Sequence, residues 1–304
     1  MTMKLPACFL LLAMISDPSL CMASDEVYLS ETESWRHQRE INLKAEDGWL
    51  SLAGLHWLKP GGNLVGSGPE NQARLPESAP VHLGEIIVEG DKAHFKTVPG
   101  VLIRLCDEPF QGGDIRTDDQ GGKPDVFSVG TLRLIVIKRG DRLALRVKDR
   151  ASPVRTKFQG LRWFPVEPSW KILAHLEPHA VPTRLEIETI VGTHERLESP
   201  GVAVFEHHGR EYRLVAALED GKLWFVFRDA TSGQSTAVNG RQLTVDQPGP
   251  DGILTLDFNR TVNLPCAYTP FATCPLPPLQ NRLDLAIPAG ERKYEPIPGT
   301  PPED

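Results

Sequence analysis

The chain has 304 residues, of which 40% are hydrophobic and 24% charged, and it carries a formal net charge of -7. This composition is typical of a globular protein with a sizeable core. The negative balance and the lack of any basic run argue against a nucleic-acid-binding protein, which needs a basic surface. The 26 glycines and 27 prolines favour short strands and tight turns over long helices.

The first 23 residues have the pattern of a secretory signal peptide. A lysine near the start precedes a short apolar segment, Phe9 to Ile15, and small residues stand before Ser24. That segment is far shorter than the roughly 20 residues that span a bilayer, and we predict no transmembrane segment elsewhere. We therefore expect an exported, periplasmic or extracellular protein, cleaved near Ala23. A lipid anchor at Cys21 is the minor alternative.

Residues 24–46 are predicted to form an N-terminal helix, because apolar side chains are spaced among charged ones without glycine or proline. The following residues, 47–62, are rich in leucine and tryptophan and end at Pro60-Gly61-Gly62. We interpret Trp49 and Trp57 as a buried anchor that ties this helix to the first sheet.

Residues 47–160 are predicted to form a first, β-sandwich-like unit. Two β-rich runs flank Glu89-Gly90-Asp91, and alternating apolar residues lie on both sides of Gly140-Asp141, so each pair of runs predicts a hairpin. Residues 107–125 are rich in glycine and aspartate and predict a flexible loop. Cys106 is expected to be buried in a strand.

Residues 161–296 are predicted to form a second, antiparallel β unit, closed by a segment rich in cysteine and proline. A short helical turn is expected near residues 166–183. The strand candidates that follow are closely spaced, which is typical of antiparallel sheets: Arg184–Val191, Val202–His207, Arg210–Leu218, Lys222–Phe227 and Gly252–Leu256. Residues 297–304 are predicted to form a disordered tail. The predicted fold class is therefore mainly β.

The opening of the first unit, "LKPGGNLVGSGPENQARLPESAPVHLGEI", resembles the opening of a forkhead-associated domain. A glycine pair, an apolar residue, Gly-Ser and an asparagine follow one another as in that family. The family's phosphothreonine-binding arginine is replaced by Ser67, and the step from Ser78 to His82 is one residue too long. The resemblance therefore favours a β-sandwich but does not support phosphopeptide binding.

Arginine and aromatic residues alternate between residues 146 and 170. Arg146, Asp149 and Arg155 stand among phenylalanines and tryptophans, which could form an aromatic-walled pocket. Guanidinium groups in such a pocket suit carboxylate or phosphate recognition. The alternative is a structural network, in which Asp149 pairs with Arg155 and the aromatic rings pack beneath the arginine stems.

Arg228 and Asp229 end a predicted strand, which is a natural position for a binding or catalytic side chain. Aspartate also simply initiates turns, so both interpretations stay open. His207-His208 is interpreted as the flank of a turn. No third or fourth ligand stands near it, so we predict no metal site and no cofactor.

The segment from Phe258 to Arg282 combines asparagines with two cysteines. Asn259, Asn263 and Asn281 are candidates for ligand contact. Cys266 and Cys274 have several interpretations: a disulfide, which an exported protein favours; a reactive thiolate beside an arginine; a soft-metal site; or buried, inert thiols. The disulfide is preferred.

Four stretches resemble the bacterial and archaeal family known as the domain of unknown function 1684 (DUF1684), most strongly over residues 132–294. They are "DGWLSLAGLHWLKPGGNLVGS", "RLALRVKDRASPVRTKFQGLRWFPVEPSW", "VFRDATSG" and "DFNRTVNLPCAYTPFATCPLPPLQNRLDLAIPAGE". The resemblance implies that functional polar residues concentrate in these stretches, and it adds Thr273 to the candidates. The family continues with Thr-Tyr where this chain has Thr236-Ala237, so a site lined by that tyrosine would be altered here.

Two functions are consistent with these residues. The first is a non-catalytic module that binds an anionic small molecule or peptide through Arg146, Arg155 and Arg228, and it is slightly favoured because no nucleophile–base pair is recognisable. The second is a cell-envelope enzyme of hydrolase or transferase type, with Asp149 or Asp229 as acid or base. In both, the candidate residues converge on one pocket. The sequence does not determine an oligomeric state.

Overall fold

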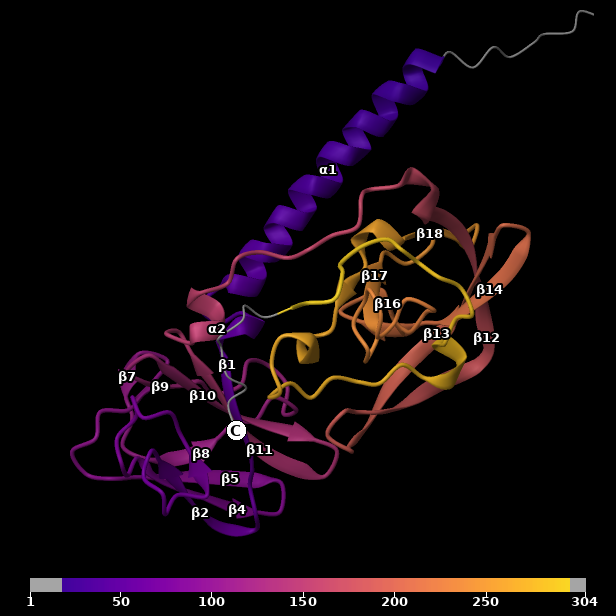
Figure 1. Ribbon diagram of the computed structural model, residues 1–304. Helices are drawn as coiled ribbons and strands as arrows, with labels where there is room; N and C mark the ends of the chain where they lie inside the picture. The colour runs from indigo at the N-terminus through magenta and orange to yellow at the C-terminus, as the bar shows by residue number, and fades with distance from the viewer. Residues whose placement is uncertain (1–17, 296–304) are drawn as a thin grey trace, which may run out of the picture.

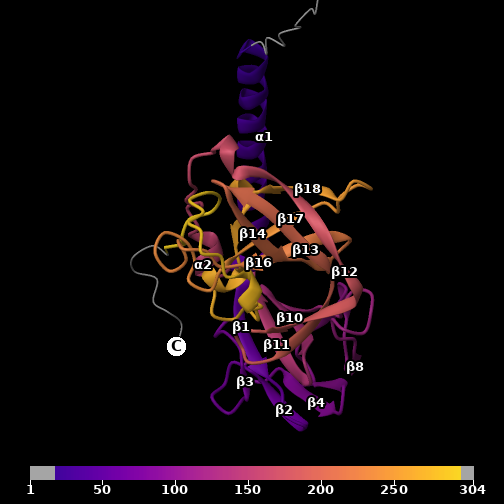
Figure 2. The same ribbon diagram turned by 90° about the vertical axis from the view of Figure 1, so that its right-hand side faces the viewer.

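The protein consists of a long N-terminal helix and two β units in the computed structural model, which describes residues 18–295. Helix α1 (Pro18–Lys44) confirms the predicted helix and begins upstream of its expected start. Its N-terminal end projects from the body of the molecule (Figures 1 and 2). Most of the predicted signal peptide, 1–23, and the predicted tail, 297–304, lie outside the described residues. Within residues 18–295, no helix combines the length and apolarity needed to cross a membrane.

The first β unit is a sandwich of two sheets. One sheet has the order β1 (Leu52–Trp57), β11 (Arg142–Asp149), β10 (Leu132–Arg139), β9 (Phe127–Val129), β6 (Arg104–Leu105) and β7 (Glu108–Pro109). The other has the order β3 (Ala73–Arg74), β2 (Gly61–Gly66), β4 (Gly84–Glu89), β5 (Lys92–Thr97) and β8 (Gly113–Ile115). Side chains from both sheets, including Ile86, Phe95, Leu134 and Leu145, fill one core between them. The predicted sandwich and both predicted hairpins are confirmed.

Strands β10 and β11 have two buried faces. Leu134 of β10 and Leu145 of β11 point into the sandwich core. Because side chains alternate along a strand, the neighbouring positions Ile137, Arg139 and Arg146 point away from it, and Ile137 and Arg146 are nevertheless buried. The outer face of this hairpin is therefore covered by other parts of the chain, and the candidate site lies on it.

The second β unit is antiparallel, as predicted, and contains two four-stranded sheets. One has the order β14 (Arg210–Val215), β13 (His194–His207), β12 (Lys171–Glu188) and β18 (Ile253–Asp257). The other has the order β15 (Ala217–Glu219), β16 (Lys222–Phe227), β17 (Arg241–Val245) and β19 (Val262–Asn263). They enclose a core that includes Trp170, Phe205, Phe225 and Phe258. In both views this unit lies between the first unit and the free end of α1 (Figures 1 and 2). The division of the chain at residue 160 stays a prediction.

The expected short helical turn is present as the 3₁₀ turn η2 (Pro168–Trp170). Other local features differ from expectation. Strand β12 begins directly after this turn and runs through two prolines; its pairing with β13 shifts between Pro178 and Thr183, where prolines are tolerated. Strand β17 was not predicted. Cys106 is exposed in the turn between β6 and β7, with φ of 48°, rather than buried in a strand.

The segment rich in cysteine and proline joins the two units. It contains the short turns η3 (Phe258–Arg260), η4 (Pro265–Ala267) and η5 (Leu279–Asn281) rather than long strands. Leu264, Ala272 and Cys274 pack in one apolar cluster with Leu52 of β1 and Trp224 of β16. The backbone N–H groups of Ile190 and Leu276 donate to Cys274 O and Glu188 O, both at 2.8 Å or less. The hydrogen bonds fix the segment to the end of β12 in the second unit, and the apolar cluster packs it against β1 of the first unit.

Candidate functional site

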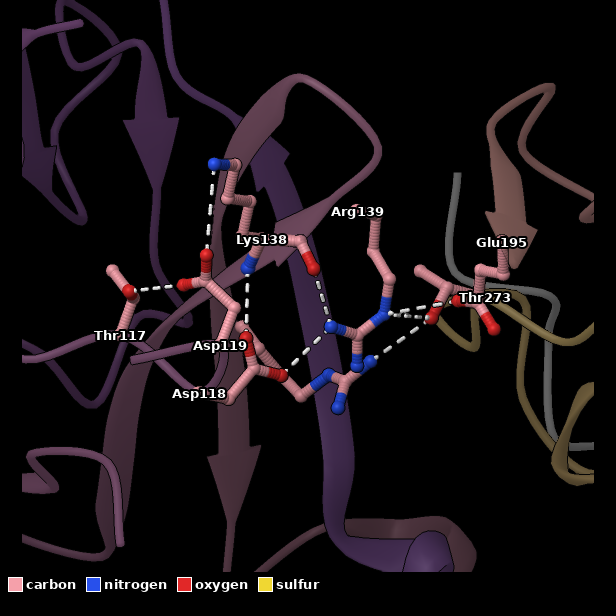
Figure 3. Close-up of polar contacts among 8 residues, drawn as sticks. Thr117, Asp118, Asp119, Lys138, Arg139, Glu195 and Thr273 are labelled. Atoms are coloured by element: carbon pink, nitrogen blue, oxygen red, sulfur yellow. Dashed lines mark hydrogen bonds and ion pairs between the residues drawn. The ribbon is translucent and has the colours of Figure 1, made fainter. Parts of the chain in front are cut away.

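Two arginines of the β10–β11 hairpin converge on one hydroxyl of the Cys/Pro segment (Figure 3). Arg139 Nε and Arg146 Nη2 each donate to Thr273 Oγ1 at 3.2 Å. Arg146 is central in β11, opposite Ile135 of β10, so the sheet holds its backbone firmly. We name Arg139, Arg146 and Thr273 the arginine cluster. It contains two of the predicted site residues, Arg146 and Thr273.

Arg146 is buried without an acidic partner. Only 8% of the residue is exposed. Among the described contacts, the bond to Thr273 is its one side-chain hydrogen bond, its Nε has no partner, and no carboxylate lies within 4.0 Å. The Trp49 ring covers it at 5.8 Å. Burial, and then repulsion from Arg139, lowers the pKa of Arg146 to about 10. A cation held in this way favours the arrival of an anion.

The acidic groups of the site lie on the Arg139 side (Figure 3). Asp118 Oδ2 is 2.7 Å from Arg139 Nη1, and its Oδ1 accepts the Lys138 backbone N–H at 2.8 Å. Glu195 Oε1 of β13 is 3.7 Å from Arg139 Nε. Burial raises the pKa of Glu195, and Arg139 opposes the shift. The carboxylates therefore contact Arg139 directly, and Arg146 has no direct acidic partner among the described residues.

The two cysteines lie next to the arginine cluster. The Cys266 backbone N–H donates to Cys274 Sγ at 3.1 Å, and Asn239 Nδ2 donates to Cys266 Sγ at 3.9 Å. Both sulfurs are free thiols in the structure. The preferred disulfide stays a prediction. The contact between Cys266 and Cys274 is consistent with it. Within residues 18–295, no three His, Cys, Asp or Glu side chains gather closely enough to hold a metal ion.

Asp149 and Arg155 do not pair with each other. Asp149 Oδ1 accepts the Ala151 N–H at 2.8 Å and closes the turn after β11. Arg155 lies in the short helix α2 (Pro153–Thr156) and donates through Nε to Lys44 O at 2.8 Å. It therefore satisfies a carbonyl at the C-terminal end of α1, a usual position for a basic side chain.

Arg228 and Asp229 lie at the end of β16. The backbone of Arg228 pairs with Asn281 and Leu283. Asp229 forms a buried ion pair with Arg241, at 2.5 Å between Oδ2 and Nη2, and both side chains are at most 1% exposed. Arg241 also donates to Ile287 O at 2.9 Å. This pair is fully enclosed and holds the C-terminal segment against β17.

The three asparagines use their amides within the fold. Asn259 Nδ2 donates to Tyr28 Oη at 2.9 Å and to Glu167 O at 2.8 Å. Asn281 accepts from Val215 N at 2.7 Å and donates to Val215 O and Val226 O, linking β14 to β16. Asn263 Nδ2 donates to Glu291 Oε1 at 2.7 Å and to Arg292 O. All three are buried and stabilise loops.

The candidate residues do not converge on one pocket as expected. Arg155, Asp229 and Asn259 have no hydrogen-bonding partner in common in the part of the chain that the structure describes. The structure brings together only Arg146 and Thr273. Sequence reasoning missed Arg139, Asp118 and Glu195. Arg139 could have been found from the sequence, because it lies two residues after Ile137 and four after Ile135, on the same face of β10.

Comparison with known proteins places residues 156–292 in the family described as protein of unknown function (DUF1684). The chain is similar to an uncharacterized protein of Haloarcula marismortui, with 33% identity over 45% of this chain and 78% of that chain and a TM-score of 0.38. No curated protein matches it.

Two forkhead-associated domain structures are also similar at 18% identity and a TM-score of 0.21, over 31% of this chain. One is described for phosphothreonine-dependent FHA domain interactions and the other is the FhaA FHA domain complexed with the intracellular domain of Rv3910; 92% and 97% of these domains are covered. Similarity at this level carries no argument about ligand.

The buried Asp229–Arg241 ion pair gives a test of its assignment as a structural pair. We expect Asp229→Asn to lower the free energy of unfolding by about 3 kcal/mol, because it leaves a buried guanidinium without its counter-charge. Asp246→Asn is the matched control: Asp246 pairs with Lys222 at 2.8 Å but its side chain is 87% exposed, so the loss should be below about 1 kcal/mol. Urea unfolding of both variants measures the difference, and equal losses would contradict this assignment.

Proposed function

The chain belongs to the DUF1684 family, and we propose that it is an exported, non-catalytic module that binds a small anion at the arginine cluster. One observation carries the proposal: Arg146 is 8% exposed and has no acidic partner among the described residues, although two carboxylates contact Arg139 next to it. Of the other predicted arginines, Arg155 donates to backbone carbonyls, and Arg228 is only partly buried.

Burial removes water from the Arg146 guanidinium and makes its unpaired charge costly. A buried charge without a partner costs several kcal/mol, and proteins normally avoid it by pairing. Here the nearest carboxylates, Asp118 and Glu195, contact Arg139 instead of Arg146. A ligand anion would provide the missing counter-charge and would recover part of that cost on binding.

The charges of the site favour a carboxylate. With Glu195 ionised, Arg139 and Arg146 are balanced by Asp118 and Glu195; with Glu195 protonated, one positive charge is left. A singly charged anion therefore suits the site better than a multiply charged one. A planar carboxylate can also accept two parallel hydrogen bonds from the unused N–H groups of Arg146. The Thr273 hydroxyl accepts from both guanidiniums, so its own hydrogen is free to donate to the ligand.

Replacement of Arg146 tests the binding site. We expect formate to raise the thermal midpoint of the wild-type protein relative to chloride at equal ionic strength, because a ligand that binds only the folded state stabilises it, by about 2.7 kcal/mol at one hundred times its Kd. Arg146→Met should abolish this shift while leaving the unliganded protein at least as stable, since a buried unpaired charge is removed. Differential scanning calorimetry measures both quantities.

Two further variants serve as controls. Arg146→Lys keeps the charge but loses the planar fork and should retain only part of the formate effect. Arg142→Lys changes an exposed arginine at the start of the same strand and should retain all of it. The proposal fails if formate and chloride act equally on the wild type, or if Arg146→Met unfolds the protein.

Glu195 predicts the pH dependence of binding. Its raised pKa means that the folded protein holds this proton above the ordinary value of 4.5, so its contribution to stability is full at low pH and is lost as pH rises through the raised pKa. Arg139 and Arg146 face the carboxyl and favour ionisation, whereas Asp118 opposes it; Glu219 of β15 also lies within electrostatic reach.

Protonation of Glu195 removes a negative charge beside Arg139, so formate should bind more tightly as pH falls from 8 to 5.5, a range in which formate itself stays ionised. Glu195→Gln should bind tightly throughout and flatten this dependence. Asp119→Asn, which changes an acid on the far side of Lys138, should leave it in place. Titration calorimetry at several pH values measures the affinities, and an unchanged slope in Glu195→Gln would rule out this carboxyl as its origin.

Export rests on the sequence of residues 1–23. Expression of the full chain in a Gram-negative host should yield a periplasmic protein whose N-terminal residue is Ser24, and Leu12→Arg should block export because a charge interrupts the apolar segment. Cys21→Ser should have no effect if the protein is not lipid-anchored. N-terminal sequencing of fractionated cells measures the outcome; an uncleaved cytoplasmic chain would contradict export.

Cleavage before Ser24 would keep the hydrogen bond from Tyr28 Oη to Asp257 Oδ1, at 2.8 Å, between α1 and the second unit.

A further inference from the structure

Cys266 and Cys274 differ in their access to solvent. Cys266 is half-buried at the end of the Pro265–Ala267 turn, whereas Cys274 is 5% exposed within the apolar cluster that joins the two units. A reagent can therefore reach Cys266 first, and Cys274 lies behind it.

The polar contacts of the pair are also unequal. Cys266 Sγ accepts from Asn239 Nδ2 at 3.9 Å. A hydrogen bond from the Cys274 thiol and the Asn239 contact lower the pKa of Cys266, while burial opposes them. The same thiol–thiol contact, followed by burial, raises the pKa of Cys274. Cys266 is thus the thiol of the pair that ionises more readily, and Cys274 the one that holds its proton more tightly.

The backbone keeps the two sulfurs in reach of each other. Cys274 O accepts the Ile190 N–H at 2.8 Å, and the Cys266 N–H reaches Cys274 Sγ at 3.1 Å. Prolines stand on either side, at Pro265 and Pro275, which restricts the segment further. The pair is therefore preorganised without being enclosed.

We propose that Cys266 and Cys274 form a redox dithiol that exchanges with small-molecule disulfides, with Cys266 as the attacking sulfur and Cys274 as the resolving sulfur. This activity is independent of anion binding at the arginine cluster, because it needs neither Arg139 nor Thr273.

The exchange balances in two steps. The Cys266 thiolate attacks one sulfur of a disulfide RSSR, its S–S bond breaks, and a mixed disulfide forms while RS⁻ leaves and takes up a proton. Cys274 then loses its proton and attacks Cys266 Sγ, so that the protein disulfide forms and the second RS⁻ leaves and is protonated. The dithiol loses two electrons and RSSR is reduced to two thiols.

The second step follows from the contacts of Cys274. In the reduced pair its thiol donates to the Cys266 thiolate, which disfavours its ionisation. Once Cys266 is in a mixed disulfide, that negative charge is gone. The Cys266 N–H and the nearby Arg146 guanidinium then remain to stabilise a Cys274 thiolate. Each sulfur therefore becomes nucleophilic when its step requires it.

Oxidised glutathione is the probe for the test. The background is the full chain with Cys8, Cys21 and Cys106 replaced by serine, since Cys106 is exposed and would react on its own. With the pair intact, we expect mass spectrometry to show a product lighter by two hydrogens and free of glutathione. Cys274→Ser should instead accumulate glutathione on Cys266, and Cys266→Ser should react at least tenfold more slowly.

A second measurement separates this activity from a merely accessible thiol. The rate of iodoacetamide alkylation at Cys266 should reach its plateau at a lower pH than that of Cys106 in the wild-type chain, because only the thiolate reacts. Asn239→Ala should move that plateau to higher pH. Equal trapping of glutathione in Cys266→Ser and Cys274→Ser, or an alkylation profile like that of Cys106, would overturn the proposal. Cys266→Ser should retain formate binding, so loss of the exchange and loss of anion binding are separate results.

Discussion

The arrangement of the protein depends on burying the outer face of the β10–β11 hairpin. That face offers Ile137 and Arg146 to the rest of the chain; the Cys/Pro segment contacts it through Thr273, while Leu264 and Ala272 pack against Leu52 of the neighbouring strand β1. Apolar contact stabilises this packing, since each fully buried aliphatic side chain contributes about 1.5–3 kcal/mol. The same contact dehydrates Arg146. The packing that joins the two units therefore also leaves Arg146 buried without a direct acidic contact.

The covering segment has little regular structure, and buried asparagines replace the bonds it lacks. A proline-rich chain cannot pair along a sheet, because proline has no N–H to donate. Asn259, Asn263 and Asn281 instead bond the backbone of elements distant in sequence, and each lies at or beside a short turn. These side chains fix the position of Thr273 and both cysteines indirectly, so their polar character reflects architecture more than ligand contact.

The sequence was sufficient for local and periodic features. The hairpins around Gly90 and Gly140 followed from alternation and turn residues, and the mainly β class followed from their number. The predicted strand Arg184–Val191 covers only the end of β12, and the earlier part was missed because its prolines resemble a break, although the register shift after Pro178 accommodates them. Arg146 and Thr273 were chosen from the sequence, but their contact spans 127 positions and is set by how the units pack. Asp118 and Glu195 belong to other elements again, so no local pattern could group them with Arg139.

Three arginines of the described chain are buried, Arg36, Arg146 and Arg241, and the two that lie in β-strands provide an internal comparison. Arg241 is 1% exposed, and it has Asp229 as counter-charge and carbonyl groups of the C-terminal segment as further acceptors. Arg146 is buried almost as completely and has one hydroxyl. Both lie in β-strands of rigid sheets, so flexibility does not explain the difference. At Arg241 the fold places a carboxylate, Asp229, against a buried guanidinium. The unmet hydrogen bonds of Arg146, beside two acids that contact its neighbour, are therefore better explained by a ligand than by packing.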